Sequence, residues 1–324
     1  MSLFQARTII VCCPRSVTGG PELLHQLVHE LRCLGHDAYI HYYPSAGYYK
    51  RPHAYDHYDA PEVDWRDDAN CLIVLPEVAT RLALRVRKAR VVLWWLSVDS
   101  YYAISAEHPL AKIPKVVGKA AILFAFLRRY THLCQSMHAM IHLQRYGISS
   151  RMLGDYLNHD YLSLAHEETE FERENLILYN PKKGVEVTKS LINFCPDFQF
   201  SPIQNMTRAE VIRLMRRAKL YIDFGHHPGK DRMPREAAIA GCCIITGRRG
   251  SAGNSEDVPI SAEYKISERN ADFPIQFQRL AADIFENFPR RSAEFTSYRI
   301  TILEEPALFR RSLVQIFGNT SLTT

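Results

Sequence analysis

Short apolar runs alternate with longer amphipathic segments along the chain, and this alternation restricts the possible folds more than any other feature. The first run, residues 8–13, leads into a turn that contains Gly19 and Gly20. Residues 21–34 then repeat leucine and valine at helical spacing, and a second apolar run follows at 37–41. Strand, glycine turn, helix and strand in this order predict the opening of a nucleotide-binding α/β domain.

The alternation occurs in two series, separated by a polar and acidic stretch at 166–175. Further strands are expected at 71–75, 91–96, 131–134, 176–179, 198–202, 220–224 and 242–246. Helices are expected at 81–88, 137–146, 185–194 and 234–240, after the capping-box pattern of Thr207 and Glu210, and from 273 onward. The sequence therefore predicts two similar α/β domains, at 1–165 and 166–295, and a helical tail at 296–324.

Charge and cysteine content limit the partners and the compartment. The net charge of +5 is mild; it suits a nucleoside diphosphate or an anionic membrane surface and is too weak to predict a nucleic-acid partner. Four of the eight cysteines form two adjacent pairs, at 12–13 and 242–243. Both pairs lie in apolar runs, which is typical of buried thiols in a reducing compartment. The apolar stretch at 9–13 is too short for a signal sequence or a membrane span. We expect a cytoplasmic protein, with peripheral contact to the inner face of the membrane as an option.

Two glycine-containing turns are candidate anion sites. Gly19 and Gly20 lie between a strand and a helix, where free N–H groups favour an anion, although a plain tight turn explains them equally well. Asn180, Lys182 and Lys183 follow the strand at 176–179, so the lysines could neutralise a diphosphate at its carboxyl end. A solvated basic turn is the alternative for this second segment.

The segment 223–246 is the richest in chemistry. Between a buried strand and a buried helix it carries His226, His227, Lys230, Asp231 and Arg232. Glu236 follows at the start of the helix. So dense a set of polar side chains on a loop held by two buried elements favours a ligand site.

These segments carry a resemblance to a known family. GGPELLHQLVHELRCLGHDAYI and PREAAIAGCCIIT resemble the glycine turn with its first helix, and the glutamate-opened helix with its strand, of retaining GT-B glycosyltransferases of the family-4 group. The chain looks like a divergent branch, similar to transferases of bacterial surface-polysaccharide synthesis. The resemblance implies a GT-B fold: an acceptor-side and a nucleotide-sugar domain, both Rossmann-like, that face a cleft, with the tail crossing back to the first domain.

The resemblance also implies roles for single residues. Glu236 would bind the ribose hydroxyls, Lys183 the diphosphate, and the amide of Gly20 the donor phosphate or sugar. Pro228 stands where the family has a second glutamate, so Asp231 or His227 would contact the donor sugar. The family's arginine before the Lys-Gly pair is also missing, so that Lys182 or Lys230 would supply the second positive charge.

The sequence contains no D-x-D triplet, so we expect a metal-independent reaction without a cofactor. Lys183, Lys230 and Arg232 are then the cations that stabilise the leaving nucleoside diphosphate. Retention of the anomeric configuration follows from the resemblance alone.

The acceptor side is less defined. Trp94, Trp95 and the tyrosines at 101 and 102 could stack on an acceptor sugar, with Asp99 as a base or a hydroxyl ligand, or the tryptophans could be core residues. Residues 113–129 mix basic and apolar side chains, which fits an interfacial helix beside a lipid-linked acceptor or a buried helix with solvated ends. Histidines at 25 and 29, and at 138 and 142, have a spacing that zinc can use, but ordinary helix-face histidines are the simpler interpretation.

We therefore predict a glycosyltransferase of polysaccharide biosynthesis that moves a sugar from a nucleotide-sugar donor to a glycan or lipid-linked acceptor. Two alternatives share the fold: a non-catalytic sugar-nucleotide or glycan-binding subunit, and an enzyme such as an epimerase that acts on the donor without an acceptor.

Overall fold

The computed structural model describes residues 8–44, 51–106, 124–166 and 172–318. It divides into two compact units, and each is described by itself. Unit 1 comprises Met1–Tyr156 with Pro306–Thr324, and unit 2 comprises Leu157–Glu305.

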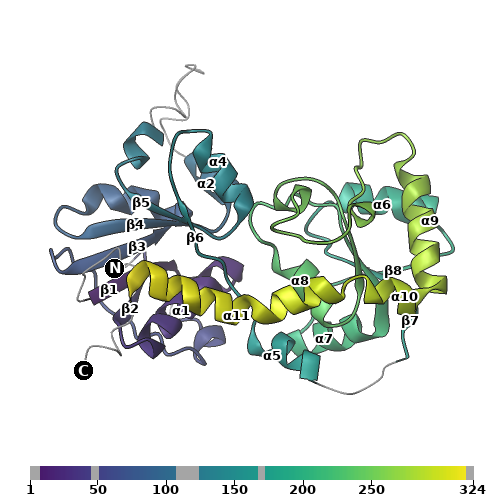
Figure 1. Cartoon of the computed structure of the whole chain (residues 1–324), viewed down its shortest axis with the longest axis horizontal. Coiled ribbons are helices and arrows are strands. Elements are labelled where there is room, and N and C mark those ends of the chain that lie inside the picture. Colours follow the sequence, from purple (N-terminus) through teal and green to yellow (C-terminus); the bar gives the residue numbers. More distant parts are fainter. Residues whose placement is uncertain (1–7, 45–50, 107–123, 167–171, 319–324) are drawn as a thin grey trace. The chain divides into compact units, whose positions relative to one another are not determined.

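Unit 1 contains a parallel sheet with the strand order β2-β1-β3-β4-β5-β6 (Figure 1). Its strands are β1 (Thr8–Pro14), β2 (Asp37–Tyr43), β3 (Cys71–Pro76), β4 (Arg90–Trp95), β5 (Thr131–Cys134) and β6 (Arg151–Met152). The central strand β3 is buried along its whole length, as expected when helices cover both faces of a parallel sheet.

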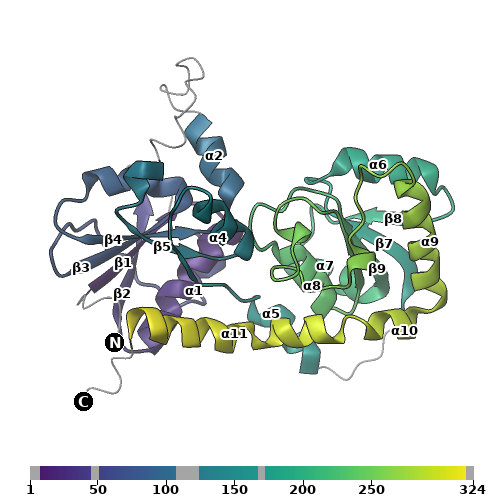
Figure 2. The same cartoon turned by 45° about the horizontal axis from the view of Figure 1, so that its top comes forward.

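Helices cover both faces of this sheet. On one face lie α1 (Gly19–Cys33) and the end of α11 (Thr296–Phe317), which places Leu27 and Leu313 in the same apolar cluster (Figure 2). On the other face lie the 3₁₀ segment η2 (Glu77–Arg85) and the helices α2 (Val98–Ala106) and α4 (Met137–Gln144). The loops that follow the strands of this sheet are therefore carried by a packed core.

Unit 2 contains a smaller parallel sheet with the strand order β10-β9-β7-β8. The strands are β7 (Glu174–Tyr179), β8 (Gln199–Pro202), β9 (Ala218–Asp223) and β10 (Cys243–Thr246). The helices are α5 (His159–Leu162), α6 (Val185–Phe194), α7 (Arg208–Arg217), α8 (Arg232–Ile239), α9 (Phe273–Glu286), α10 (Phe288–Ala293) and the first half of α11. One apolar cluster fills the unit and includes both cysteines of the pair Cys242–Cys243. The expected burial of the two cysteine pairs is confirmed, because all four side chains are 0 % exposed.

The boundary between the units follows Tyr156, not residue 165. The reason is α5, which packs against α8 and contributes Tyr161 to the core of unit 2. At the other end of the chain, α11 changes unit at Pro306, and Phe309 is buried in the core of unit 1.

The local predictions agree with the structure in one case and differ in another. The capping box of Thr207 and Glu210 is confirmed at the start of α7. The helix expected at 81–88 is instead η2, which ends at Arg85. It ends there because the N–H groups of residues 87–89 donate to the carboxylate of Asp67 at 2.8 Å, so they are taken from any helical ladder.

The expected interfacial segment 113–129 lies mostly outside the described residues. In its described part, 124–129, the side chains of Phe124 and Leu127 are buried, and Phe124 stacks on Tyr146 at 3.9 Å between ring centroids. No helix in the described ranges is both long and apolar enough to cross a bilayer.

Candidate functional site

Two loops of unit 2 follow the carboxyl ends of the neighbouring strands β7 and β9. The loop at 180–184 carries Lys183, and the loop at 224–231 carries Asp231. Because β7 and β9 are paired in parallel, these loops meet at one edge of the sheet. Lys183 Nζ lies 2.5 Å from Asp231 Oδ2. The fold thus brings together two of the residues that the sequence predicts to be catalytic.

A close approach of the two backbones holds this pair in place. Gly184 precedes α6 with a φ of 59°, and a Cβ there would lie 2.6 Å from the amide nitrogen of Gly225. A Cβ on Gly225 would lie 2.7 Å from Cβ of Lys183. Both positions therefore require glycine, which gives the Lys-Gly sequence a steric reason as well as a chemical one.

His227 lies beneath this pair and is fully buried. Its Nε2 is 3.3 Å from Asp223 Oδ1, and its Nδ1 is 3.4 Å from Asp231 Oδ2. Burial lowers the pKa of the imidazole, but the two carboxylates outweigh it and leave the pKa raised. Burial by itself would raise the pKa of Asp223, but the contacts with His227, Lys183 and the N–H of Gly225 outweigh it, and the pKa is lowered. The sequence suggested that His227 contacts the donor; in the structure its side chain is fully buried and lies against Asp231.

Asp223, His227 and Asp231 offer ligand atoms within 4.8 Å of one another, a spacing that a metal ion could use. However, each imidazole nitrogen faces its own carboxylate, and a metal ion would take only one of them. It would also compete with the ammonium of Lys183 for Asp231 and require a neutral imidazole. These contacts fit an imidazolium that bridges two carboxylates better than they fit a metal ligand set.

A buried ion-pair network supports the loop from the other side. Glu305 of α11 places Oε2 2.7 Å from Nη1 of Arg235 and Oε1 2.7 Å from Nζ of Lys230. Arg235 is fully buried and also donates to the carbonyl oxygens of Lys230 and Asp231 at 3.2 and 3.3 Å. Lys230, predicted to bind the diphosphate, therefore already has a carboxylate partner. The sequence did not single out Arg235 or Glu305, because the partners lie 70 residues apart and form no local pattern.

Glu236 is buried on α8, one residue beyond Arg235. Its Oε1 lies 3.4 Å from Nη2 of Arg232, one helical turn earlier. Tyr161 of α5 approaches it from the other side: burial, followed by the charge of Glu236, raises the pKa of this phenol. The carboxylate predicted to bind ribose is therefore held by a guanidinium and a phenol.

The other predicted residues of unit 2 lie on the same two loops. Asn180 accepts the N–H of Lys182 at 2.9 Å with its side chain, which fixes the turn. The side chain of Lys182 is exposed, unlike that of Lys183. Of the adjacent histidines, His226 is exposed and His227 buried. Pro228 lies on the same loop, in the position of the missing glutamate.

The candidates of unit 1 lie at the carboxyl ends of β1 and β4. Gly19 and Gly20 begin α1, and a Cβ on Gly20 would make only an ordinary contact, 3.7 Å from Leu96. Packing inside unit 1 therefore does not require glycine at this position. Asp99 is exposed in the first turn of α2. The stacking role proposed for Trp94 and Trp95 is excluded, because both indoles are 0 % exposed in the core.

Both histidine pairs serve as ordinary helix residues. His25 is buried, bonds Tyr42 at 2.7 Å and stacks on Tyr55; burial lowers its pKa to about 4. His29 accepts the N–H of Asp59, and His142 bonds Tyr102 at 3.1 Å. These partners leave the zinc interpretation without support.

Glu77 is a buried carboxyl group that the sequence analysis did not select. It follows β3 directly, and its Oε2 accepts the N–H of Leu96 at 2.9 Å, beyond the end of β4. Burial raises its pKa to about 7, against the opposing effect of backbone N–H groups. Its place after a buried strand, at the sheet edge where ligands bind, is the signal that could have found it.

This carboxyl group makes the stability of the fold depend on pH. The pKa of Glu77 is higher in the folded state than its unfolded value of 4.5. Its contribution to the free energy of unfolding is therefore complete below about pH 4.5 and is lost as the pH rises through 7. We expect the free energy of unfolding of wild type, relative to Glu77→Gln, to fall by roughly 3 kcal/mol between about pH 5 and 8. Urea unfolding of both proteins across this range measures the difference, and a difference that does not change with pH would contradict the prediction.

Comparison with known proteins identifies the architecture. No family model and no curated protein matches the sequence. Among solved structures, Anabaena HepE, determined with UDP-glucose, matches with a TM-score of 0.60 and 10 % identity over 95 % of this chain and all of its own. Sucrose-phosphate synthase from Thermosynechococcus elongatus matches with 0.59 and 10 % identity, over 95 % and 99 % of the two chains. An α,α-trehalose-phosphate synthase (UDP-forming) from Burkholderia vietnamiensis matches with 0.58 and 12 % identity over the same shares. The chain therefore has the GT-B fold, as its two parallel-sheet α/β units, its long C-terminal helix and these structural neighbours show.

Proposed function

We propose that the chain is a glycosyltransferase that takes a sugar from a nucleotide-sugar donor and transfers it to a glycan or lipid-linked acceptor in polysaccharide biosynthesis. The observation that carries the proposal is the Lys183–Asp231 pair at the shared carboxyl edge of β7 and β9. The GT-B fold and the UDP-glucose held by HepE support a nucleotide-sugar donor.

The chemistry requires that negative charge on the leaving diphosphate be stabilised as the glycosidic bond breaks. Lys183 can supply a cation that Asp231 orients. Helix α6 begins two residues later, at Val185, so its first N–H groups add to the positive field. Arg232, at the first position of α8, is a second cation at the same edge. The proposal assigns this stabilisation to protein cations and helix ends, without a metal ion or a cofactor, and with retention at the anomeric carbon.

Glu236 is proposed to accept hydrogen bonds from the ribose hydroxyls. Arg232 and Tyr161 keep the group in place, so the carboxylate is ordered before the nucleotide arrives. Lys182, Asn180 and the amide of Gly20 are proposed as further donor contacts, and Asp99 as the acceptor-side base. A cytoplasmic location, with peripheral membrane contact through 113–129, remains part of the proposal.

Binding of nucleotides to the pure protein tests this assignment. A donor that binds only the folded chain raises its melting temperature, so a panel of nucleoside diphosphates and nucleotide sugars, with and without a divalent metal, identifies the donor class. We expect one nucleotide to shift the transition, and Glu236→Ala to weaken its binding by about 1–3 kcal/mol. Glu172→Ala, an exposed residue before β7 at the opposite edge of the sheet, is the matched control and leaves the affinity unchanged.

The outcomes separate the proposal from its alternatives. No shift with any nucleotide would overturn the donor site and favour glycan binding. Binding without turnover, with any glycan or lipid-linked acceptor offered, would favour the non-catalytic subunit. Conversion of the donor in the absence of an acceptor would favour an epimerase.

A further inference from the structure

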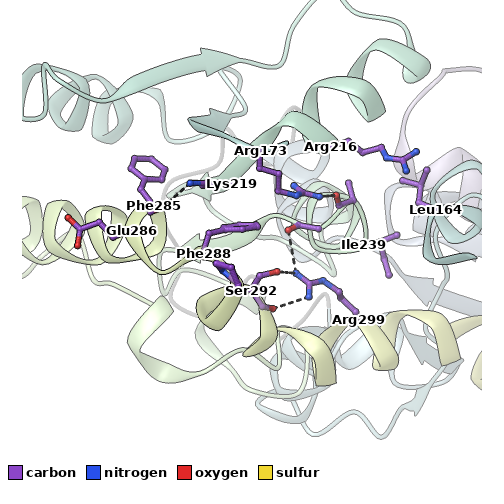
Figure 3. Close-up of a pocket in the computed structure, with 13 residues that line it drawn as sticks. Leu164, Arg173, Arg216, Lys219, Ile239, Phe285, Glu286, Phe288, Ser292 and Arg299 are labelled. Atoms are coloured by element: carbon purple, nitrogen blue, oxygen red, sulfur yellow. Dashed lines mark hydrogen bonds between the residues drawn. The ribbon is translucent and has the colours of Figure 1, made fainter. Parts of the chain in front are cut away.

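A cavity of about 710 Å³ opens in unit 2 at the edge of the sheet opposite to the Lys183–Asp231 pair (Figure 3). Lys219 lines it from the start of β9, Arg173 from the residue before β7, and Gly241 from the turn before β10. The pair at 183 and 231 follows the other ends of β7 and β9. Six residues of extended strand, roughly 20 Å, separate the two edges. The cavity is therefore distinct from the proposed donor site.

Basic side chains dominate the lining of this cavity. Among the described residues, Arg173, Arg216, Lys219 and Arg299 line it, against one carboxylate, that of Glu286. Figure 3 shows Lys219 beside Phe285. Arg173 Cζ and Lys219 Nζ lie 5.6 and 5.7 Å from the centroid of the Phe288 ring. The lining thus combines at least three clustered positive charges with two aromatic rings.

Three of these cations bond only neutral acceptors within the described part of the chain. Arg173 donates to the carbonyl oxygens of residues 215, 218 and 240, at the ends of α7 and α8. Arg299 donates to the carbonyls of 238, 241 and 292 and to the hydroxyl of Ser292. Lys219 donates to Asn175 Oδ1 at 2.7 Å and to the carbonyl of Phe285 at 2.9 Å. These bonds orient the cations, yet the two helix ends offset only about one unit of charge.

The remaining positive charge is concentrated and partly removed from water. Burial, and the nearby charge of Arg173, lower the pKa of Arg299. An arginine has five N–H groups and a lysine three, so each of these side chains keeps N–H capacity beyond the bonds described. An anion bound between them would use that capacity and relieve their mutual repulsion.

We propose that this cavity binds a small organic phosphate monoester. A phosphomonoester carries nearly two negative charges at neutral pH and offers three acceptor oxygens, which matches the cluster of Arg173, Lys219 and Arg299. Its organic part would lie along Phe285 and Phe288. The volume is within the range of small-molecule sites, about 300–1,000 Å³. This inference does not depend on the proposed sugar transfer.

Calorimetric titration of the full chain with phenyl phosphate and with inorganic phosphate tests it. Phenyl phosphate suits the test because it has the aromatic and anionic parts but no nucleotide or sugar. We expect one saturable site for phenyl phosphate, with inorganic phosphate binding more weakly. The same titration in the Lys183→Gln variant keeps that site, which excludes binding at the donor edge.

The decisive variant is Lys219→Gln, because it removes one charge without disturbing the helix ends that Arg173 and Arg299 cap. We expect it to weaken phenyl phosphate at least tenfold, while Lys189→Gln, the same change on exposed α6, leaves the affinity unchanged. Phe288→Ala is expected to reduce the preference for phenyl phosphate over inorganic phosphate. Circular dichroism and the melting temperature establish that each variant is folded.

Four results would overturn the proposal. The first is that the wild-type protein shows no saturable binding at millimolar phenyl phosphate. The second is that Lys219→Gln and Lys189→Gln bind phenyl phosphate with equal affinity. The third concerns Glu167, Glu168 and Glu170, which the sequence places between the lining residues Leu164 and Arg173. Binding only after these glutamates are changed to glutamine would assign the cavity to the chain's own acidic segment. If vesicles with phosphatidic acid bind through Lys219 and phenyl phosphate does not, the ligand is a lipid headgroup and the small-molecule assignment is wrong.

Discussion

Replacing Glu305 with alanine is expected to lower the free energy of unfolding by about 3–5 kcal/mol. The carboxylate is buried and 2.7 Å from the guanidinium of Arg235, which is itself 0 % exposed. Without Glu305, that charge stays in the interior beside the carbonyl oxygens of Lys230 and Asp231. Urea unfolding of the full chain, followed by circular dichroism, measures the change.

Two controls separate a stranded charge from a lost contact. Lys230→Met removes the more exposed cation from the same carboxylate and is expected to cost only about 1 kcal/mol. The double variant Arg235→Met, Glu305→Met removes both buried charges and is expected to recover most of the loss. If Glu305→Ala costs no more than Lys230→Met, the buried pair does not stabilise this loop.

The network also explains how distant parts of the chain shape the proposed donor edge. Arg235 bonds the backbone of Lys230 and Asp231, and Asp231 in turn holds Lys183. Glu305, on the last helix, therefore acts through two residues on the cation that the proposed mechanism uses. Glu305→Ala should thus weaken nucleotide binding as well as the fold.

Elements with a strong local pattern could be predicted from the sequence. Buried strands such as Cys71–Pro76 are continuous apolar runs, and the capping box at Thr207 needs only four residues. The edge that gathers Lys183 and Asp231 also follows from local rules, because each loop comes after an apolar run and parallel strands align their ends.

Features that depend on contacts far along the chain could not be predicted. Nothing in the sequence distinguishes exposed His226 from buried His227, because the backbone of His227 pairs with Gly250 and accepts the N–H of Ser251, more than 20 residues later. The tryptophans at 94 and 95 fitted a core or a sugar platform equally well until their burial was known. The basic cavity is the extreme case, since β9, the residue before β7 and α11 each contribute one cation to it.

Lys183→Ala is expected to lower turnover of the donor by about 10²–10³-fold, with a much smaller effect on the fold. The ammonium of Lys183 lies on the loop that follows β7, and a carboxylate oxygen of Asp231 at 2.5 Å orients it. An oriented charge of this kind has its largest effect on the transition state. Release of nucleoside diphosphate from the donor found in the binding panel measures the rate. Lys189→Ala, an exposed lysine on α6, should leave the rate within threefold.

The variant also leaves Asp231 without its ammonium, so a loss of activity could come from an unbalanced carboxylate next to the phosphates. The double variant Lys183→Ala, Asp231→Asn distinguishes the two causes, because it removes both charges of the pair. If the missing cation is responsible, the double variant stays as slow as Lys183→Ala; recovery toward wild type would mean that Asp231 alone inhibits. A folded Lys183→Ala protein with the full rate would remove Lys183 from the mechanism and transfer its role to Arg232, which lies 3.4 Å from Glu236.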